Sequence, residues 1–424
     1  MDNRRIKNWD ELATSENRKS ALAVMEAAFQ SIDTRKTIKD SIKLDGETLR
    51  VCDKTFDLAK FNTIKVVGFG KASIQAAIVL EEILGSRISE GAVIGLSKAD
   101  CKFINTFSGT HPRPSVQNIS AGKKIYEIAE NAKEGDLLIV LVSGGGSALL
   151  CYSEEECDQH ALLYDKFLKS GKTITEINTV RKHLSVLKGG GLAKIAYPAT
   201  VIGLIFSDIP GDDFFNVASG PTYKDESTVL NAQNIIDQYH LGSFNLIETP
   251  KENKYFEKVH NLVLVSNRIA VDAMSKKAQE LSFNTEVISV ELYDEVSTAI
   301  RKIFNVEKEG TIVLAAGEPE IKVDKKGGQG GRNLHMGLKA IEKRLIDSDS
   351  VFISFSSDGM DNSDAAGAIV DSLTLEKARK LKLDAGDYAS RFDSYNFFKQ
   401  TRDLIMTGPT DANVSDLMLL LTKK

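Results

Sequence analysis

The sequence predicts an α/β protein with a largely parallel sheet and a division into two α/β domains. Short apolar runs alternate with helical patterns along most of the chain, as in proteins whose strands are joined by helices. These runs lack polar alternation, which is typical of strands buried on both faces. The length of 424 residues is sufficient for two domains.

The first half of the chain opens with a helix and a hairpin. Apolar residues recur at helical spacing from Leu22 to Ile32 and form one stripe. Residues 42–51 predict a hairpin that turns at Asp45-Gly46. Four strands buried on both faces are then expected at residues 64–67, 92–96, 137–142 and 200–206.

The polar stretch at residues 243–260 marks the expected domain boundary. We predict domains at 1–255 and 256–424, with the option that the last roughly 20 residues pack back on the first domain. Strands of the second domain are expected at residues 262–265, 285–290, 311–316 and 351–355.

Composition excludes several classes of partner. The net charge of −5 is spread along the chain, so neither a nucleic acid nor an anionic membrane is expected as a partner. The charged N-terminus does not resemble a secretory signal, which predicts a cytoplasmic protein. Four cysteines without a CxxC pair predict free buried thiols instead of disulfides or zinc. We expect a monomer or homodimer that binds a small molecule.

A first glycine cluster, Gly68-Phe-Gly70-Lys71-Ala-Ser73, follows the strand at 64–67. It is an incomplete dinucleotide fingerprint, because the third glycine position holds Ser73. Lys71 at the start of a helix would oppose the helix dipole unless an anion lies beside it. We interpret Lys71 as a functional cation; the alternative is a solvated surface lysine.

A second glycine cluster directly follows the strand at 137–142 and has the chemistry of a phosphate site. Three consecutive glycines let several backbone N–H groups converge on one anion, and the flanking serines add donors. The alternative is a flexible turn, and the chain has no GxxxxGK[ST] loop. The cluster consists of Ser143, Gly144, Gly145, Gly146 and Ser147.

Asn178 and Arg181 are three residues apart in a predicted helix and so share one face. A guanidinium on that face suits a carboxylate or a phosphate, although the helix could equally expose its charges to water. Further on, Asp208 and Asp212 follow the strand at 200–206, where carboxylates suit Mg²⁺ or simply a turn. In the second half, Arg332 follows a glycine loop as another anion-facing cation.

These groups form one chemical set, since phosphoryl transfer needs cations, backbone donors, a metal and positioning. The chain lacks GxSxG, HExxH and CxxC motifs, and its six histidines show no metal-ligand spacing. The set favours a kinase. An oxidoreductase would require an acidic residue after the second strand, and Glu90 precedes that strand instead.

The motifs, in order, resemble those of the glycerate 2-kinase family, whose C-terminal portion is called the MOFRL domain. The resemblance covers residues 60–420. It implies a larger Rossmann-like domain with a mostly parallel sheet, a smaller C-terminal MOFRL domain, and an active site in the cleft between them. The motifs are GFGKAS (68–73), THPRP (110–114), SGGGSALL (143–150), TEINTVRKHLSVLKGGGLA (175–193), SDIPGDDFFNVASGPT (207–222), GGQGGRN (327–333), SSDGMDNSDAAGA (356–368) and TGPTDANVSDL (407–417).

The resemblance implies transfer of the γ-phosphate of ATP to the 2-hydroxyl of D-glycerate with Mg²⁺. The family's active-site lysine and arginine match Lys71 and Arg332. We predict Lys71, Arg332 and Asp208 as catalytic residues, and Asp208 and Asp212 as metal ligands. Arg181, Asn178 and Ser219 are predicted to bind the substrate. The residues predicted to bind ATP are Gly70, Ser143, Gly144, Gly145, Gly146, Ser147, Lys188 and Asp358.

Several positions depart from the family pattern, and they bear on the identity of the acceptor. Most lie in the second half, at Ala316–Pro319, His335, Asn362 and Asp411. Small changes in such loops can admit a related hydroxy acid without altering the reaction class. The alternatives are a hydroxypyruvate reductase-type oxidoreductase, a non-catalytic sugar-acid-binding protein, and a kinase for an unrelated acceptor.

Overall fold

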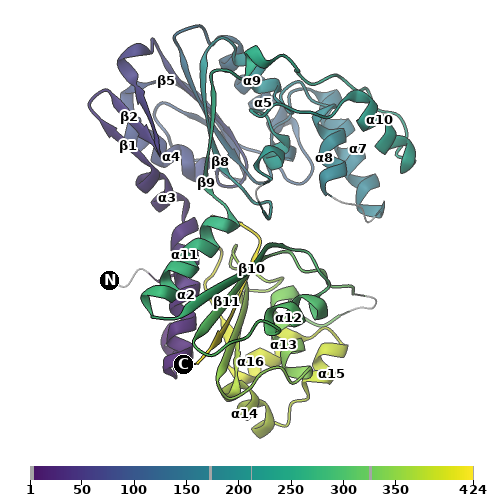
Figure 1. Ribbon diagram of the computed structural model, residues 1–424. Coiled ribbons are helices and arrows are strands. Elements are labelled where there is room, and N and C mark those ends of the chain that lie inside the picture. Colours follow the sequence, from purple (N-terminus) through teal and green to yellow (C-terminus); the bar gives the residue numbers. More distant parts are fainter. Residues whose placement is uncertain (1–3, 171–173, 212, 324–326, 424) are drawn as a thin grey trace. The chain divides into compact units, whose positions relative to one another are not determined.

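A six-stranded sheet with the order β6-β5-β4-β7-β8-β9 organises the first half of the chain (Figure 1). The pairs β6–β5, β5–β4, β4–β7 and β7–β8 are parallel. The computed structural model describes residues 4–170, 174–211, 213–323 and 327–423. The strands of this sheet are β4 (Ile64–Phe69), β5 (Ile88–Gly95), β6 (Asn105–Ser108), β7 (Leu137–Ser143), β8 (Thr200–Phe206) and β9 (Val259–Val265).

The strand order explains where the chemistry gathers. The chain moves outward from β4 to β5 and β6, and then returns to place β7 on the other side of β4. This reversal is a topological switch point, and the loops that follow β4 and β7 leave the same edge of the sheet on either side of it. Open α/β sheets bind their ligands at such points. Both glycine clusters lie in these two loops.

Smaller elements complete this part of the chain. An antiparallel sheet, β1-β2-β3, begins with the predicted hairpin and adds a third strand. Its strands are β1 (Ile42–Asp45), β2 (Thr48–Val51) and β3 (Lys54–Asp57). The helices are α3 (Thr34–Ser41), α4 (Ser73–Leu84), α5 (Val116–Glu130), α6 (Gly146–Leu149), α7 (Glu154–Ser170), α8 (Ile174–Lys182), α9 (Gly191–Ala196) and α10 (Val229–Gln238), with 3₁₀ turns η1 (Leu58–Lys60), η2 (Gly85–Arg87), η3 (Phe214–Ser219) and η4 (Asn253–Tyr255).

The second half of the chain forms a mixed sheet with the order β10-β11-β15-β12-β13-β14. β15 is antiparallel to both β11 and β12, and β10 is parallel to β11. Its strands are β10 (Asn284–Leu292), β11 (Thr311–Gly317), β12 (Ser350–Ser356), β13 (Gly367–Asp371), β14 (Leu404–Ile405) and β15 (Asp416–Thr422). The helices are α1 (Trp9–Leu12), α2 (Glu16–Ile32), α11 (Asn267–Glu280), α12 (Val296–Phe304), α13 (Arg332–Glu342), α14 (Ser372–Lys380), α15 (Ala385–Ser390) and α16 (Ser394–Thr401).

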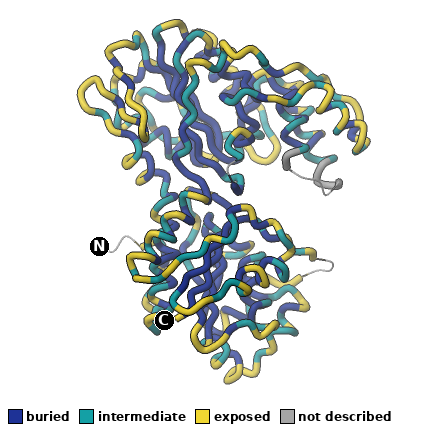
Figure 2. Tube along the Cα trace, viewed as in Figure 1, coloured by how far each residue is buried: buried dark blue, intermediate teal, exposed yellow. Residues whose placement is uncertain are grey.

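The chain divides into two compact units. The parallel-sheet unit contains Thr34–Ile209 and Asp213–Leu264, and the mixed-sheet unit contains Met1–Asp33, Pro210–Asp212 and Val265–Lys424. Figure 2 shows that the central strands of both large sheets are buried, and the edge strands β6 and β10 are only partly buried. Their apolar side chains form the core of each unit, which is what their unbroken apolar sequences predict.

This division differs from the predicted boundary at residue 255. The opening helix α2 packs on α11, β12 and β15 in the mixed-sheet unit instead of joining the residues that follow it. The run at 262–265 was expected to open the second domain, but as part of β9 it completes the first sheet. The end of the chain does not return to the first domain, because β15 lies inside the mixed sheet.

The cysteines also differ from expectation. Cys151 and Cys157 form a disulfide with their Cα atoms 5.9 Å apart, whereas Cys52 and Cys101 are free. The start of α7 at Glu154 explains the pairing, since the first helical turn brings Cys157 back toward Cys151. In the described part of the chain, no helix combines the length and apolar composition needed to cross a bilayer.

Candidate active site

The loop after β4 is fixed against the loop after β7. Gly70 has a φ of +124°, and a Cβ at this position would lie 2.2 Å from the Oγ of Ser143. No residue with a side chain can replace Gly70 without moving one of the loops. The N–H of Lys71 then donates to the carbonyl of Gly144 over 2.9 Å. These contacts hold Lys71 beside the second glycine cluster.

The loop after β7 is equally tight. Ser143 Oγ accepts a hydrogen bond from the N–H of Ala72 at 3.1 Å. A Cβ on Gly144 would lie 2.1 Å from Oδ2 of Asp208, so the aspartate carboxylate packs directly on the glycine backbone. Gly145 has a φ of +78°, and the aliphatic part of Lys71 lies against it. The loop therefore has Lys71 on one side and Asp208 on the other.

Ser219 and Asn178 join the same site from η3 and α8. The hydroxyls of Ser147 and Ser219 are 2.9 Å apart, and Ser219 donates to Oδ1 of Asn178 over 3.3 Å. Ser219 and its neighbour Ala218 have φ values of +61° and +51°. Residues with a Cβ adopt this region at an energetic cost, and such strain concentrates at functional sites.

A cavity of about 250 Å³ lies among these residues within the parallel-sheet unit. Gly145, Ser147, Asn178, Arg181 and Asp208 all line it. They come from three separate segments, namely the one after β7, α8 and the one after β8. The segments after β7 and β8 leave the same edge of the sheet, because these two strands are parallel neighbours. Five of the residues predicted from the first half of the sequence therefore line one cavity.

Arg181 gives this cavity a positive charge. Burial lowers the pKa of Arg181 to about 10, which still leaves the guanidinium charged at neutral pH. Among the described residues, no carboxylate forms an ion pair with it. Burial and the charges of Lys71 and Arg181 lower the pKa of His111, which also lines the cavity. Since an unpaired buried charge is costly, the cavity is built to receive an anion.

The predicted metal ligands are only partly described. Asp208 lies at the cavity, whereas Asp212 is outside the described residues. Within the described ranges, no three His, Cys, Asp or Glu side chains cluster closely enough to form a metal cage. A single carboxylate suits Mg²⁺ that is bound mainly by substrate phosphates and water.

Lys188 has a different environment from the one predicted. It is fully buried, and its Nζ donates to the carbonyl of Leu150 at 2.7 Å and to Oε1 of Glu156 at 2.8 Å. Nε2 of His160 lies 3.4 Å away. These three neighbours occupy the three donors of the ammonium group. Lys188 ties the segment after the glycine cluster to α7, and its ammonium has no donor left for a nucleotide.

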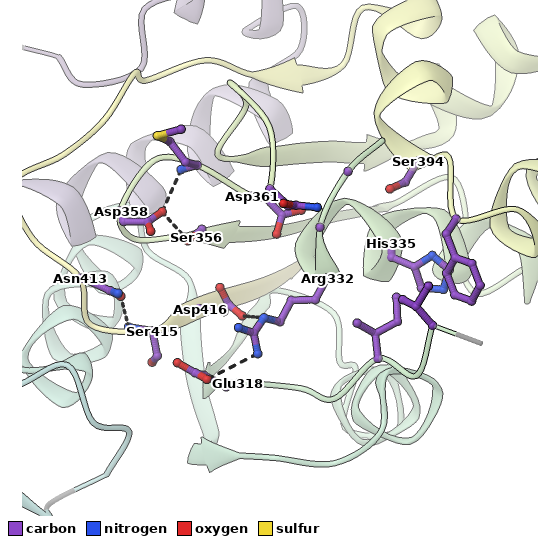
Figure 3. Close-up of a pocket in the computed structure, with 17 residues that line it drawn as sticks. Glu318, Arg332, His335, Ser356, Asp358, Asp361, Ser394, Asn413, Ser415 and Asp416 are labelled. Atoms are coloured by element: carbon purple, nitrogen blue, oxygen red, sulfur yellow. Dashed lines mark hydrogen bonds and ion pairs between the residues drawn. The ribbon is translucent and has the colours of Figure 1, made fainter. Parts of the chain in front are cut away.

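A second cavity, of about 370 Å³, lies within the mixed-sheet unit (Figure 3). Arg332, the first residue of α13, lines it. Asp361 caps this helix by accepting hydrogen bonds from the N–H groups of Asn333 at 3.1 Å and Leu334 at 2.8 Å. A Cβ on Gly331 would lie 2.3 Å from Oδ1 of Asp361, which explains the glycine before Arg332. The cap fixes the start of α13 and therefore the backbone position from which the Arg332 side chain extends.

Two carboxylates face Arg332. Its Nε lies 3.0 Å from Oδ2 of Asp416, and its Nη1 lies 3.5 Å from Oε2 of Glu318. Asp358 lines the same cavity, and its Oδ1 accepts hydrogen bonds from Ser356 Oγ and the N–H of Met360 within its own loop. The structure thus brings Arg332 and Asp358 together, as two residues of one cavity.

Sequence reasoning missed the acidic partners of Arg332. Asp416 lies in the motif TGPTDANVSDL, but no pattern predicted that a strand would carry it back to α13. Glu318 directly follows β11, and that position at a strand end was the one available signal. His335 stacks on Phe392 with ring centroids 5.5 Å apart, and burial lowers its pKa to about 4, so it is neutral.

Comparisons with known proteins agree with this geometry. Residues 20–248 match a domain of unknown function, DUF4147, and residues 311–416 match the MOFRL family. A glycerate 2-kinase from Pyrococcus horikoshii is 32% identical over 95% of this chain and 97% of its own length. The chain belongs to the glycerate 2-kinase family with a MOFRL domain.

Other members of the glycerate 2-kinase family extend the comparison. A D-glycerate 2-kinase from Thermotoga maritima is 33% identical over 87% of this chain and 93% of its own length. The crystal structure of a Thermotoga maritima glycerate kinase superposes with a TM-score of 0.84 at 30% identity, covering 95% of this chain and 99% of that one. The family fold of a Rossmann-like parallel sheet followed by a MOFRL domain is therefore confirmed.

Proposed function

We propose that this chain transfers the γ-phosphate of ATP to the 2-hydroxyl of D-glycerate, giving 2-phospho-D-glycerate and ADP. The observation that carries the proposal is the small cationic cavity of the parallel-sheet unit, where Arg181 has no carboxylate partner among the described residues. The relatives of this chain that are named glycerate 2-kinase support D-glycerate as the acid that is phosphorylated. The substrate carboxylate supplies the missing counter-charge.

In this proposal Arg181 binds the glycerate carboxylate with two parallel hydrogen bonds. The hydroxyl of Ser147 and the amide of Asn178 line the cavity and orient the two hydroxyls of the substrate. Ser219 is fully buried behind them and is hydrogen-bonded to both, so it holds them in position. A polar pocket of this kind distinguishes glycerate from acids without a 2-hydroxyl, because its buried polar groups would then lose their partner.

The two glycine loops would hold the phosphates. Lys71 and the backbone of Gly144–Gly146 lie at the switch point of the sheet, where open α/β folds bind anionic ligands. The 2-hydroxyl oxygen bonds to the γ-phosphorus while the bond to the bridging oxygen of ADP breaks, and the hydroxyl proton leaves to solvent. Lys71 offsets the charge on the transferred group, and Arg332 stays a proposed catalytic residue.

Asp208 is the described residue that would hold Mg²⁺. Its carboxylate packs against Gly144, and so beside the proposed phosphate loop. One carboxylate together with phosphates and water is a donor set that Mg²⁺ accepts. When bound, Mg²⁺ would neutralise charge on the phosphates. Asp212 stays a proposed second ligand.

The main alternative, a hydroxypyruvate reductase, has less support. A dinucleotide-binding sheet carries an acidic residue at the end of its second strand to bind the ribose hydroxyls. Here that strand is β5, and Leu96, Ser97 and Lys98 follow its last residue. Glu90 lies inside β5 and pairs with Lys65 at 3.2 Å.

The test is a coupled ADP-release assay with ATP, Mg²⁺ and D-glycerate, with the product identified by ³¹P NMR. We expect ADP and 2-phosphoglycerate in equal amounts, and no release with L-glycerate. A 3-phospho product would contradict the proposed regiochemistry. Absence of ADP, together with oxidation of a reduced nicotinamide nucleotide by hydroxypyruvate, would replace the proposal with the reductase alternative.

A further inference from the structure

Asp416 is held in place by the sheet and by a hydrogen bond beside Arg332. It begins β15 and pairs in register with Gly317 of β11 on one side and Ser356 of β12 on the other. Its Oδ1 accepts a hydrogen bond from Nδ2 of Asn333 at 2.7 Å. Asn333 is itself fixed by Ser354, which donates to its Oδ1 at 2.6 Å. The carboxylate orientation is therefore set by the sheet.

The other oxygen of Asp416 faces Arg332. Figure 3 shows the Arg332 side chain extended between Asp416 and Glu318. Asp416 is 4% exposed, whereas the side chains of Arg332 and Glu318 are 36% and 41% exposed. Oδ2 has no hydrogen-bond donor among the described residues, and its one close partner is the Nε of Arg332 in an ion pair. A buried, rigid acid directed at a solvent-accessible arginine is an arrangement suited to positioning that arginine.

We propose that Asp416 is a positioning residue that holds the guanidinium of Arg332 for phosphoryl transfer, so that protonation of Asp416 lowers turnover. This inference rests on the proposed kinase function. To that function the inference adds a residue that acts without touching the substrate. It also adds a pH dependence of turnover that originates in the mixed-sheet unit.

The groups around Asp416 favour a change in its charge near neutral pH. Burial raises the pKa of Asp416 to about 7, against the lowering effects of the Arg332 charge and the Asn333 hydrogen bond. Asp361 and Glu318, which face it from the other packed segments, raise the pKa further. Above pH 7 the carboxylate is charged and pairs with Arg332. Below pH 7 it is neutral, and the guanidinium loses its buried partner.

The first experiment compares pH profiles of the wild type and Asp416→Asn from about pH 5 to about pH 9. In the variant, the amide nitrogen would face the N–H of Arg332 while Oδ1 keeps its bond to Asn333. We expect kcat to fall about tenfold or more at alkaline pH, with KM for glycerate changed less than threefold. At acidic pH the two proteins should converge.

Comparing the pH profiles of the wild type and Asp416→Asn isolates the effect of Asp416, because protonation of the nucleotide affects both proteins equally. Glu318→Gln is the matched control: it removes the other acid beside Arg332 and should keep the pH-dependent transition, with a midpoint at or somewhat below that of the wild type, because Glu318 raises the pKa of Asp416. The inference is overturned if Asp416→Asn keeps the full kcat at alkaline pH or shows the same difference from the wild type at every pH.

A second readout does not require turnover. The ¹⁵Nε resonance of Arg332, assigned through Arg332→Lys, should shift with a midpoint near pH 7 in the wild type and lose that transition in Asp416→Asn. If the resonance does not titrate, the inference fails even in an active kinase. If it titrates in a protein that phosphorylates no glycerate, the pairing stands and the proposed function fails.

Discussion

Arg181 is a half-buried cation and Lys188 a fully buried one, and the two differ in their partners. Lys188 has each of its three donors taken by a neighbouring group, and the charge of Glu156 balances its own. Arg181 has no acid beside it in the described part of the chain. A paired cation stabilises the fold, whereas an unpaired one needs a ligand to offset its desolvation. On this difference we propose that Arg181 binds the substrate and that Lys188 stabilises the fold.

Arg181→Lys should test that assignment. A lysine keeps the charge but loses the planar pair of donors, so we expect KM for D-glycerate to rise about tenfold or more with a smaller change in kcat. KM for ATP should stay near the wild-type value. Steady-state kinetics with each substrate varied in turn would measure this.

Arg87→Lys is the control for that variant. Arg87 pairs with Glu47 at the surface, 2.8 Å apart, and should tolerate the exchange. A larger rise in KM for ATP than for glycerate would contradict the assignment and would place Arg181 at the nucleotide phosphates.

At the residue scale, the sequence points to candidate cations more readily than to the acids that pair with them. Lys71 and Arg332 could be proposed because each lies beside a glycine loop, and Arg181 because it shares a helix face with Asn178. Asp416 could not, because its role depends on β15 pairing between two strands that are distant in sequence. Local patterns do not contain that information.

At the element scale, the apolar runs predicted most strands of both sheets but not which sheet each would join. The run at 262–265 shows this well. It follows a polar stretch that is typical of a boundary, yet β9 is placed by hydrogen bonding next to β8, where the N–H of Val201 donates to the carbonyl of Lys258. Partner choice is a tertiary effect, and the apolar character of a strand is the same in either sheet.

The close packing of Gly144 against Asp208 in the loop after β7 can be tested by substitution. In Gly144→Ala the new Cβ would lie 2.1 Å from Oδ2 of Asp208, so the carboxylate or the loop must move. We expect kcat to fall about 100-fold, with a loss of stability of about 1–3 kcal/mol. Kinetics and denaturant unfolding would separate these effects.

Gly386→Ala is a suitable control for that exchange. Its Cβ would approach no atom more closely than Oδ1 of Asp384 at 3.2 Å, at the start of the surface helix α15. If Gly144→Ala retained wild-type turnover, Asp208 would have no part in catalysis and the phosphate loop would lie elsewhere.

At the scale of the whole molecule, a buried ion cluster joins the start of the chain to its second half. Arg18 is fully buried on α2 and contacts both oxygens of Asp371, at 2.7 and 2.6 Å, and Asp403 at 2.9 Å. Lys377 also reaches Asp403 at 2.7 Å. This cluster explains why the first helix belongs to the mixed-sheet unit, which helical periodicity could not reveal.

Arg18→Ala should therefore destabilise the mixed-sheet unit. The change leaves two buried carboxylates without their main counter-charge, for an expected loss of about 3–5 kcal/mol. Urea unfolding followed by circular dichroism would measure it. Lys19→Ala, the adjacent exposed residue that pairs with Glu16, should change stability by less than about 0.5 kcal/mol. Equal stability of the two variants would mean that the cluster does not hold α2.

The discontinuity of the mixed-sheet unit has a consequence for how the protein is made. α2 leaves the ribosome early, but β12 and β15, on which it packs, are translated more than 300 residues later. In the sequence, the parallel-sheet unit comes between α2 and these strands and is nearly continuous. It can therefore fold first. α11 is translated earlier and covers part of α2, but the part of α2 that packs on β12 and β15 stays exposed until those strands are complete, which makes the intermediate prone to aggregation.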